Sequence, residues 1–220
     1  MKRVVMFIAL LGVTFALSAQ VRFGVFAGPA VTTTDYSVKG QRQDTRAKPG
    51  VHAGLVYKVP FDNNLFFSPS IAYSMIGYRV TLTQPSYPPD LLAVNNNVLF
   101  HEVNLDLLLQ IDLGKKPSHF FFKIGPSFDF ALFGHEKYEL STGETVNRSM
   151  KFSVIKGYGR YNFSPLGELG HESASGWFLY AYYMPHLFSM NNEEGGPQIQ
   201  NRLTGFTIGR YFQKKKAVTP

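Results

Sequence analysis

Alternating apolar and polar positions are clearest between Val98 and Phe133. In residues 99–112 the odd positions are mostly apolar and the even positions mostly polar, and in residues 120–132 the two phases are exchanged. Alternation with a period of two is typical of a β-strand with two different faces. A short polar segment at residues 114–118 separates the two patterns. The sequence therefore predicts two long strands joined as a hairpin.

The register of this hairpin decides which residues share a face. Antiparallel pairing about Lys115 and Lys116 puts both apolar rows on one face and places Glu102 opposite Asp129 on the polar face. Each row exceeds the ~5–6 residues of an ordinary globular strand and fits the ~9–11 residues of a tilted transmembrane strand. A dry core would not accept the ionised groups unpaired. The hairpin therefore predicts a membrane β-barrel, with a soluble sandwich or lipocalin-like barrel as the alternative.

The rest of the chain extends this pattern to an all-β fold. We expect an eight-stranded antiparallel transmembrane barrel with strands near residues 21–28, 51–59, 65–80, 99–112, 120–132, 150–163, 176–188 and 199–212. Long loops at 32–50, 81–97, 134–149 and 191–198 alternate with short turns, apart from a medium-length turn at 164–175. Short periplasmic turns and long extracellular loops are typical of outer-membrane barrels, so we expect the protein in the cell outer membrane.

The N-terminal residues 1–19 predict a signal peptide. A basic start, Met1-Lys2-Arg3, precedes an apolar run at residues 4–17 and the small pair Ser18-Ala19, so cleavage is expected after Ala19. The run is shorter than the ~18 residues that a spanning helix needs. The chain has no cysteine, which excludes a lipoprotein anchor and disulfides. Residues 20–212 then form the barrel, and residues 213–220 form a basic C-terminal tail.

Composition agrees with a barrel and argues against nucleic-acid binding. Aromatic residues make up 15% and charged residues 17% of the chain, and the mean hydropathy is −0.08. Of the net charge of +7, two charges belong to Lys2 and Arg3, and others to the tail at 214–216. The basic residues are not gathered into one stripe, so we expect no nucleic-acid partner.

Several segments resemble one family of barrels. They are the leader ending Ser-Ala-Gln, the first strand at residues 22–28, the third strand at 67–74 and the start of the fifth at 122–126. They are similar to the PorT-like outer-membrane β-barrel family of Bacteroidetes, over essentially all of the mature chain. The resemblance implies an eight-stranded outer-membrane barrel, and the founding member is tied to type IX protein secretion. One departure is the tail, because such barrels often end on an aromatic that the assembly machinery reads.

Candidate chemistry is sparse. Six histidines occur, but none forms a pair with metal-ligand spacing, so we expect neither metal nor cofactor. His171-Glu172-Ser173 is similar to the His-x-Ser of barrel lipid A deacylases, although polar turn residues are the commoner explanation. Phosphate-binding loops and nucleophile elbows are missing from the sequence. We therefore expect a protein that is not an enzyme.

The barrel interior holds the more substantial constellation. Residues expected to face the lumen are Arg22, Lys58, Glu102, Asp106, Lys123, Asp129, Lys156, Arg160 and Arg210. Eight strands enclose only enough room for side chains. A plug of ion pairs that satisfies these charges is therefore favoured over a conducting pore.

Function is expected in the extracellular loops, where binding residues often lie on rigid scaffolds. The best candidate surface is the segment 86–97, rich in Tyr, Pro and Asn, with the candidate binding residues Ser86, Tyr87, Pro88 and Asp90. This predicts an adhesin, a surface receptor or an accessory subunit of an envelope or secretion complex. Expected partners are outer-membrane lipid and such an envelope protein. The alternatives are a narrow porin-like channel and a lipid-modifying enzyme.

Overall fold

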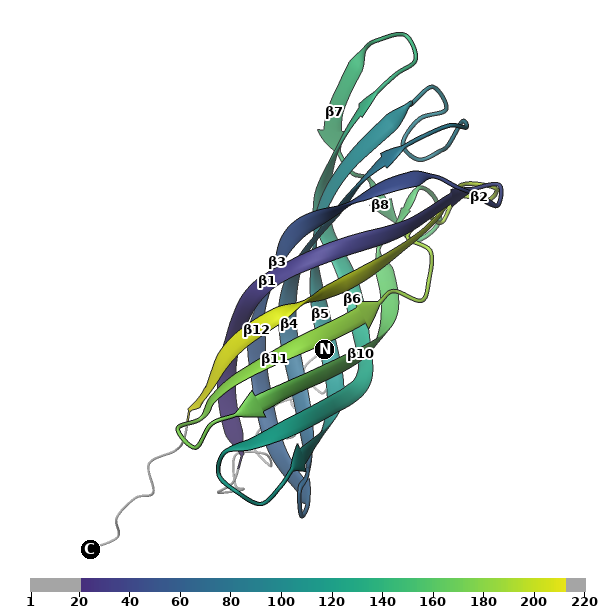
Figure 1. Ribbon diagram of the computed structural model, residues 1–220. Coiled ribbons are helices and arrows are strands. Elements are labelled where there is room, and N and C mark those ends of the chain that lie inside the picture. Colours follow the sequence, from purple (N-terminus) through teal and green to yellow (C-terminus); the bar gives the residue numbers. More distant parts are fainter. Residues whose placement is uncertain (1–20, 213–220) are drawn as a thin grey trace, which may run out of the picture.

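Eight long strands form a closed antiparallel ring in the computed structural model, which describes residues 21–212 (Figure 1). They are β1 (Arg22–Val38), β3 (Asp44–Asp62), β4 (Leu65–Thr81), β5 (Asn95–Leu113), β6 (His119–Glu139), β10 (Tyr161–Glu172), β11 (Trp177–Pro185) and β12 (Gln198–Phe212). Neighbours in sequence pair along the ring, and β12 pairs with β1 to close it. The eight-stranded barrel is confirmed. The predicted signal peptide and basic tail lie outside the described residues.

Four short strands are present in addition to the eight strands of the ring. β2 (Gln41–Arg42) pairs with β1, β7 (Thr145–Ser149) extends β6 as a hairpin, and β8 (Phe152–Ser153) pairs in parallel with β9 (Tyr158–Gly159). Within residues 21–212 no helix is long and apolar enough to cross a membrane.

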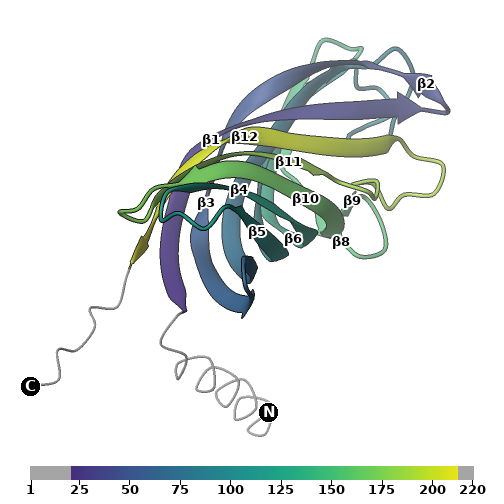
Figure 2. The same ribbon diagram turned by 60° about the horizontal axis from the view of Figure 1, so that its bottom comes forward.

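The turns at the two ends of the barrel differ in length. Tight turns after Asp62, Leu113 and Glu172 gather at one end, where β1 begins and β12 ends (Figures 1 and 2). The connections of residues 82–94, 140–160 and 186–197 gather at the other end, where the hairpin of β6 and β7 projects farthest. The tight-turn end is therefore periplasmic and the other end extracellular.

The first extracellular connection differs from its prediction. Residues 32–50 were expected to be a polar loop, but β1 continues to Val38 and β3 begins at Asp44, with the chain reversing at Lys39 and Gly40, both with positive φ. Thr32 and Thr34 point inward and are buried. Threonine is a good strand former, so a segment with the polar composition of a loop forms strands instead.

The sixth barrel strand also differs from its prediction. It was expected at residues 150–163, with a turn at 164–175, but β10 spans Tyr161–Glu172 and the turn covers only residues 173–176. Pro165, Gly167 and Gly170 gave this stretch the composition of a turn. A Cβ at Gly170 would lie 2.4 Å from the carbonyl oxygen of Leu179. The glycine thus permits close approach of β10 and β11, and the periplasmic turns are all short.

Inside and outside exchange character along the length of β4, β5 and β6. Below the level of Ser74, Glu102 and Asp129, inward residues are mostly polar and outward ones mostly apolar; we call this part the membrane zone. Leu105, Ile124 and Phe128 are 43%, 53% and 47% exposed there, whereas Asp106 and Lys123 are 1% and 2% exposed. These orientations agree with the prediction, and an exposed apolar belt around a polar interior fits a lipid surround.

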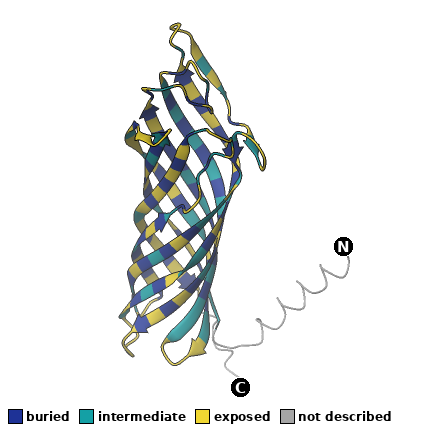
Figure 3. Cartoon of the chain, turned by 90° about the vertical axis from the view of Figure 1, so that its right-hand side faces the viewer, coloured by how far each residue is buried: buried dark blue, intermediate teal, exposed yellow. Residues whose placement is uncertain are grey.

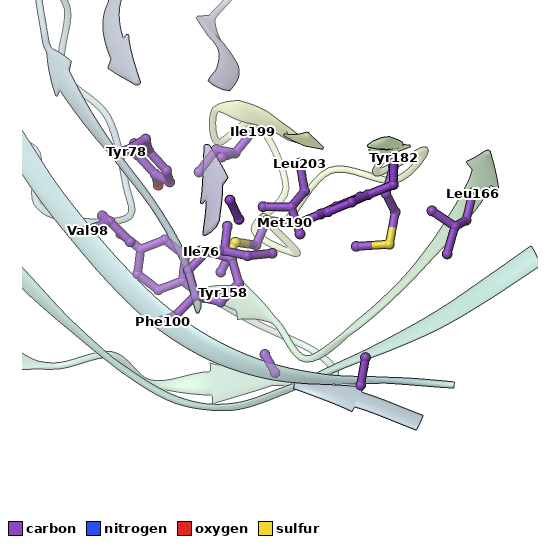
Figure 4. Packing of buried hydrophobic residues seen from close by; sticks show 14 of the residues in the cluster. Ile76, Tyr78, Val98, Phe100, Tyr158, Leu166, Tyr182, Met190, Ile199 and Leu203 are labelled. Carbon is purple, nitrogen blue, oxygen red and sulfur yellow. The ribbon is translucent and has the colours of Figure 1, made fainter. Parts of the chain in front are cut away.

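Above that level, in what we call the outer zone, the arrangement is that of a soluble protein. Burial still alternates along each strand (Figure 3), but the inward side chains are now mostly apolar. Ile76, Tyr78, Val98, Phe100 and Leu203 belong to one cluster of buried hydrophobic residues inside the ring (Figure 4). Polar residues such as Arg79 and Asn97 take the outward positions. The barrel therefore continues beyond the membrane around a hydrophobic core.

Candidate functional site

The periplasmic end of the lumen holds a buried ion cluster. Lys58 on β3 reaches Asp112 on β5 at 2.6 Å (Nζ–Oδ2) and Glu172 on β10 at 3.0 Å (Nζ–Oε2). Arg22 on β1 also pairs with Glu172, and His119 Nε2 lies 3.0 Å from the Asp112 carboxylate. Because β3 and β10 are not neighbours in the ring, these bonds cross the lumen.

A second buried pair lies in the middle of the membrane zone. Lys123 on β6 and Glu168 on β10 are register partners, and their charged atoms are 2.8 Å apart. The Lys123 ammonium also lies 5.2 Å from the ring centres of Phe121 and Tyr180 and 5.9 Å from that of Phe178. Aromatic faces attract a desolvated cation. One ammonium is thus held by a carboxylate and three rings.

The upper lumen acids are held differently. The Asn104 amide donates to Glu102 and to Asp129, both at 2.9 Å, and Ser127 donates to Asp129 at 2.6 Å. The His186 imidazole approaches both acids, with Nε2 3.6 Å from Glu102 and 3.8 Å from Asp129. Neutral donors and one imidazole therefore replace the arginines and lysines expected there.

The predicted register of the central hairpin is wrong by two residues. Asp129 pairs with Asn104 and Glu102 pairs with Ala131, and a bulge follows above these pairs, between Glu102 and His101. The ladder ends at the pair Leu113–Phe120, so the turn is centred later in the chain than the two lysines. The shift is even, which preserves the faces. It also places an amide, in place of a second carboxylate, directly across from Asp129.

The structure places the predicted lumen residues unevenly. Arg22, Lys58, Glu102, Asp106, Lys123 and Asp129 line the lumen. Lys156 does not, because it is exposed in the connection of residues 140–160, outside any barrel strand. Arg160 lies at the extracellular rim, 5.5 Å from the centre of the Phe130 ring.

Arg210 also contradicts its prediction. It is exposed on the outward face of β12 near the periplasmic end and lies 5.3 Å from the centre of the Trp177 ring. An arginine beside a tryptophan at a membrane–water boundary can keep its charge in the headgroup layer while its stem lies along apolar surface. The inward and outward positions of β12 are therefore the reverse of those expected for Arg210.

The predicted set lacks several buried partners, namely Asp112, Glu168, Glu172 and His186. Glu168 and Glu172 were hidden because residues 164–175 were interpreted as a turn. A signal existed, since Tyr161, Phe163 and Leu169 alternate with inward Ser164 and with these acids. His186 follows the end of β11, and no periodic pattern covers it.

A polar bridge ties the loops to the extracellular rim. Glu136 accepts hydrogen bonds from Arg148 Nε at 2.7 Å and from the Tyr158 hydroxyl at 2.6 Å. Burial raises the pKa of the Tyr158 phenol well above its ordinary value, so it remains a donor. Arg148 also donates to the carbonyl of Pro89 at 2.8 Å. The connections 82–94 and 140–160 are thus joined around one carboxylate.

The predicted binding loop is only partly accessible. Ser86 and Pro88 are buried, and the Tyr36 hydroxyl bonds to Ser86 Oγ at 2.8 Å. Tyr87 is exposed and Asp90 partly so, while the neighbours Leu91 and Leu92 are 61% and 53% exposed. Part of the loop therefore faces the barrel, and its exposed part is apolar.

The His-x-Ser segment does not form a dyad in the structure. His171 Nε2 bonds to Ser118 Oγ at 3.0 Å, and the Ser173 hydroxyl instead contacts Ser175 Oγ at 3.0 Å. His171 lies in β10, whereas Ser173 lies in the turn that follows the strand. The sequence resemblance to a deacylase motif is therefore not matched by geometry.

A family model for the outer membrane protein beta-barrel domain matches residues 15–192. The chain belongs to this family. Its location in the cell outer membrane follows from the family together with the apolar belt. None of the curated proteins matches the chain.

Solved outer-membrane barrels share the architecture of this family member. OprG from Pseudomonas aeruginosa is 10% identical, with a TM-score of 0.52 over 88% of this chain and 96% of that one. Ail of Yersinia pestis, solved with the heparin analogue sucrose octasulfate, is 13% identical, with a TM-score of 0.46 over 87% of this chain and 99% of Ail. Neisserial surface protein A is 11% identical, with a TM-score of 0.45 over 89% and 98% of the two chains. At these identities the likeness concerns the fold alone.

Proposed function

We propose that this barrel is a non-enzymatic surface protein that binds another envelope protein through its extracellular loops. The observation that carries the proposal is the exposed apolar pair Leu91 and Leu92 on the β4–β5 loop, beside exposed Tyr87. Exposed apolar groups on an anchored loop are typical of protein interaction sites, and aromatic residues are enriched in interface cores.

The loop that carries this pair is held in place. The backbone nitrogen of Leu82 donates to Val94 at 2.8 Å, and that of Ser141 donates to Leu92 at 2.8 Å. Arg148 holds Pro89 from the side of β7. An ordered loop loses less conformational entropy on binding than a free one, so the anchoring supports a binding role.

The filled lumen supports the same proposal over a channel. Ion pairs at the periplasmic end, Lys123 with its aromatic rings in the middle and the buried cluster of the outer zone occupy successive levels. The resemblance to the PorT-like family extends the proposal: the partner belongs to an envelope or secretion complex, with this barrel as an accessory subunit.

The test is cross-linking in intact outer membranes followed by purification of the barrel. The variant Leu91→Ser with Leu92→Ser should lose the partner that co-purifies with the wild type. Val154→Ser with Ile155→Ser changes an even more exposed apolar pair on another loop and should retain the partner. Equal recovery from the wild type and the Leu91/Leu92 variant would contradict the proposal. Steady single-channel currents of the wild type in planar bilayers would favour the channel.

A further inference from the structure

A row of cations crosses the outward face of β3, β4, β5 and β6 in the outer zone. The register aligns Arg46 with Arg79, Arg79 with Asn97, and Asn97 with Lys137. Arg46, Arg79 and Lys137 are all exposed. Because the four residues are successive cross-strand neighbours, their side chains leave the same face of the sheet.

A β-bulge adds a fourth cation to this row. The pairing of β3 with β4 shifts by one residue between Ala47 and His52, so that Arg46 lies above the shift and Lys48 lies within it. Lys48 Nζ donates to Asn97 Oδ1 at 2.8 Å and to the carbonyl of Val98 at 2.9 Å. These bonds hold its ammonium beside the row, and bulges commonly re-aim side chains in this way.

The row lines a depression, and its positive charges lie apart from carboxylates. A hollow of about 400 Å³ opens among residues that include Arg46, Arg79, Asn97 and Lys137. Within residues 21–212 no carboxylate lies within 4.0 Å of the charged atoms of the four cations. The adjoining part of the ring differs, because Arg42 and Arg202 both pair with Asp35 on β1.

The height of the row on the barrel indicates what surrounds it. Four residues below Asn97 on β5, His101 stacks on Phe133 and bonds to Tyr73. Such outward aromatic groups are typical of the membrane boundary. Four residues span ~13 Å along a strand, or roughly 9 Å along the membrane normal at a ~45° tilt. Arginine and lysine stems extend several ångströms, so the charges reach the headgroup layer.

We propose that this row binds the phosphate groups of a phosphorylated lipid in the outer leaflet of the outer membrane. Its acyl chains would lie against the apolar face of β4 to β6 below, where Ile71 and Leu105 are exposed. Guanidinium groups suit phosphate because they donate two parallel hydrogen bonds. Asp44 and Glu139 lie in the next outward-facing row, farther from the membrane than the cations and beside Thr81 and Asn95. They would repel an anion there and so keep the phosphate at the level of the cations.

The probe for this site is lipid A carrying two phosphates, added to the full-length barrel in phosphatidylcholine nanodiscs. Binding is measured by native mass spectrometry and by titration of a fluorescent lipid A. Replacing three cations, Arg46→Gln, Arg79→Gln and Lys137→Gln, should weaken binding at least tenfold, because each surface cation contributes ~1 kcal/mol near a headgroup layer. The single variant Arg79→Gln should weaken it about fivefold.

The matched control removes the same charge from exposed extracellular positions, with Lys39→Gln, Lys151→Gln and Lys156→Gln. It should change affinity by less than about twofold. Lipid A without phosphates should bind the wild type and the triple variant alike. Heat-modifiability on gels checks that each variant folds, and the single variant serves if the triple variant does not.

Three results would overturn the proposal: unchanged affinity of the Arg79→Gln and triple variants, an equal loss in the control, or equally tight binding of a soluble phosphorylated disaccharide without acyl chains. The last result would assign the row to a soluble anion.

Discussion

The membrane zone and the outer zone are built from the same strands, but they bury opposite kinds of side chain. On β5, Asp106 and Gln110 face inward in the membrane zone, whereas Val98 and Phe100 do so above it. Outward, Leu109 gives way to Asn97. β4 and β5 each run as one continuous strand through both zones. The difference shows that the surrounding solvent, lipid below and water above, selects which face of an alternating strand is apolar.

The two zones also differ in how the interior is held together. The membrane zone depends on directional pairs such as Lys123 with Glu168, each of which fails if one partner is removed. The outer zone depends on non-directional packing of apolar and tyrosine side chains. Substitutions should therefore have different consequences in the two zones.

The largest effect is expected from Lys123→Met, which leaves Glu168 buried without its partner. The free energy of unfolding in lipid vesicles, measured by urea titration, should fall by about 3–5 kcal/mol. Adding Glu168→Met should recover most of this loss, because an apolar pair replaces the ion pair. If the double variant is no more stable than the single one, the ion pair of Lys123 and Glu168 does not stabilise this part of the lumen.

The second-largest effect on stability is expected from a charge placed on the outer surface of the membrane zone. Ile124→Arg, which faces lipid in the membrane zone, should cost about 2–4 kcal/mol near the midplane. His135→Arg faces outward on the same strand in the outer zone and should change stability by less than about 0.5 kcal/mol. Heat-modifiability on gels reports both. Equal tolerance of the two arginines would mean that the zones are wrongly drawn.

A smaller loss is expected where neutral donors hold the lumen acids. Glu102→Gln with Asp129→Asn turns acceptors into amides that oppose Asn104 and Ser127, so unfolding should become easier by about 1–3 kcal/mol. Glu144→Gln with Glu194→Gln makes the same change at exposed loop positions and should leave the melting temperature unchanged. Wild-type melting of the lumen variant would contradict the plug of paired groups.

The smallest effect should come from the rim of the outer zone. Tyr158→Phe removes one donor to Glu136 and should cost about 0.5–1.5 kcal/mol. Because the pKa of the Tyr158 phenol is raised in the folded protein, its contribution is complete at neutral pH and declines as the pH rises above the ordinary tyrosine value. Urea unfolding at neutral and strongly alkaline pH should show the wild type and the variant converging.

The sequence predicted three neighbouring strands better than the rest of the ring. Period-two alternation identified β4, β5 and β6 and their faces, because lipid outside and polar groups inside give a strong contrast. It failed at residues 32–50, where threonines face inward, and at residues 164–175, where proline and glycine imitate a turn. In these two segments the inward and outward residues differ little in polarity. The strands can therefore be recognised only from their pairing with neighbouring strands.

The candidate site was predictable only in part, for a related reason. Which residues face inward follows from one strand, so Lys58 and Lys123 were found. Their partners Glu168 and Glu172 were not found, because residues 164–175 were interpreted as a turn and because the stagger between strands decides which side chains meet. His186 lies beyond a strand end, and the outward row of Arg46, Arg79 and Lys137 appears only after three registers are known.

The pairing of β1 with β12 brings Phe23 opposite Phe212, and every other barrel strand pairs with its neighbour along the chain. The order of strands around the ring is therefore the order of synthesis, and no strand is topologically first. A circular permutant that joins Phe212 to Arg22 by a short linker and opens the chain between Asn63 and Asn64 would contain every native strand pair. The gene for this barrel could thus begin at any periplasmic turn and still encode the same ring.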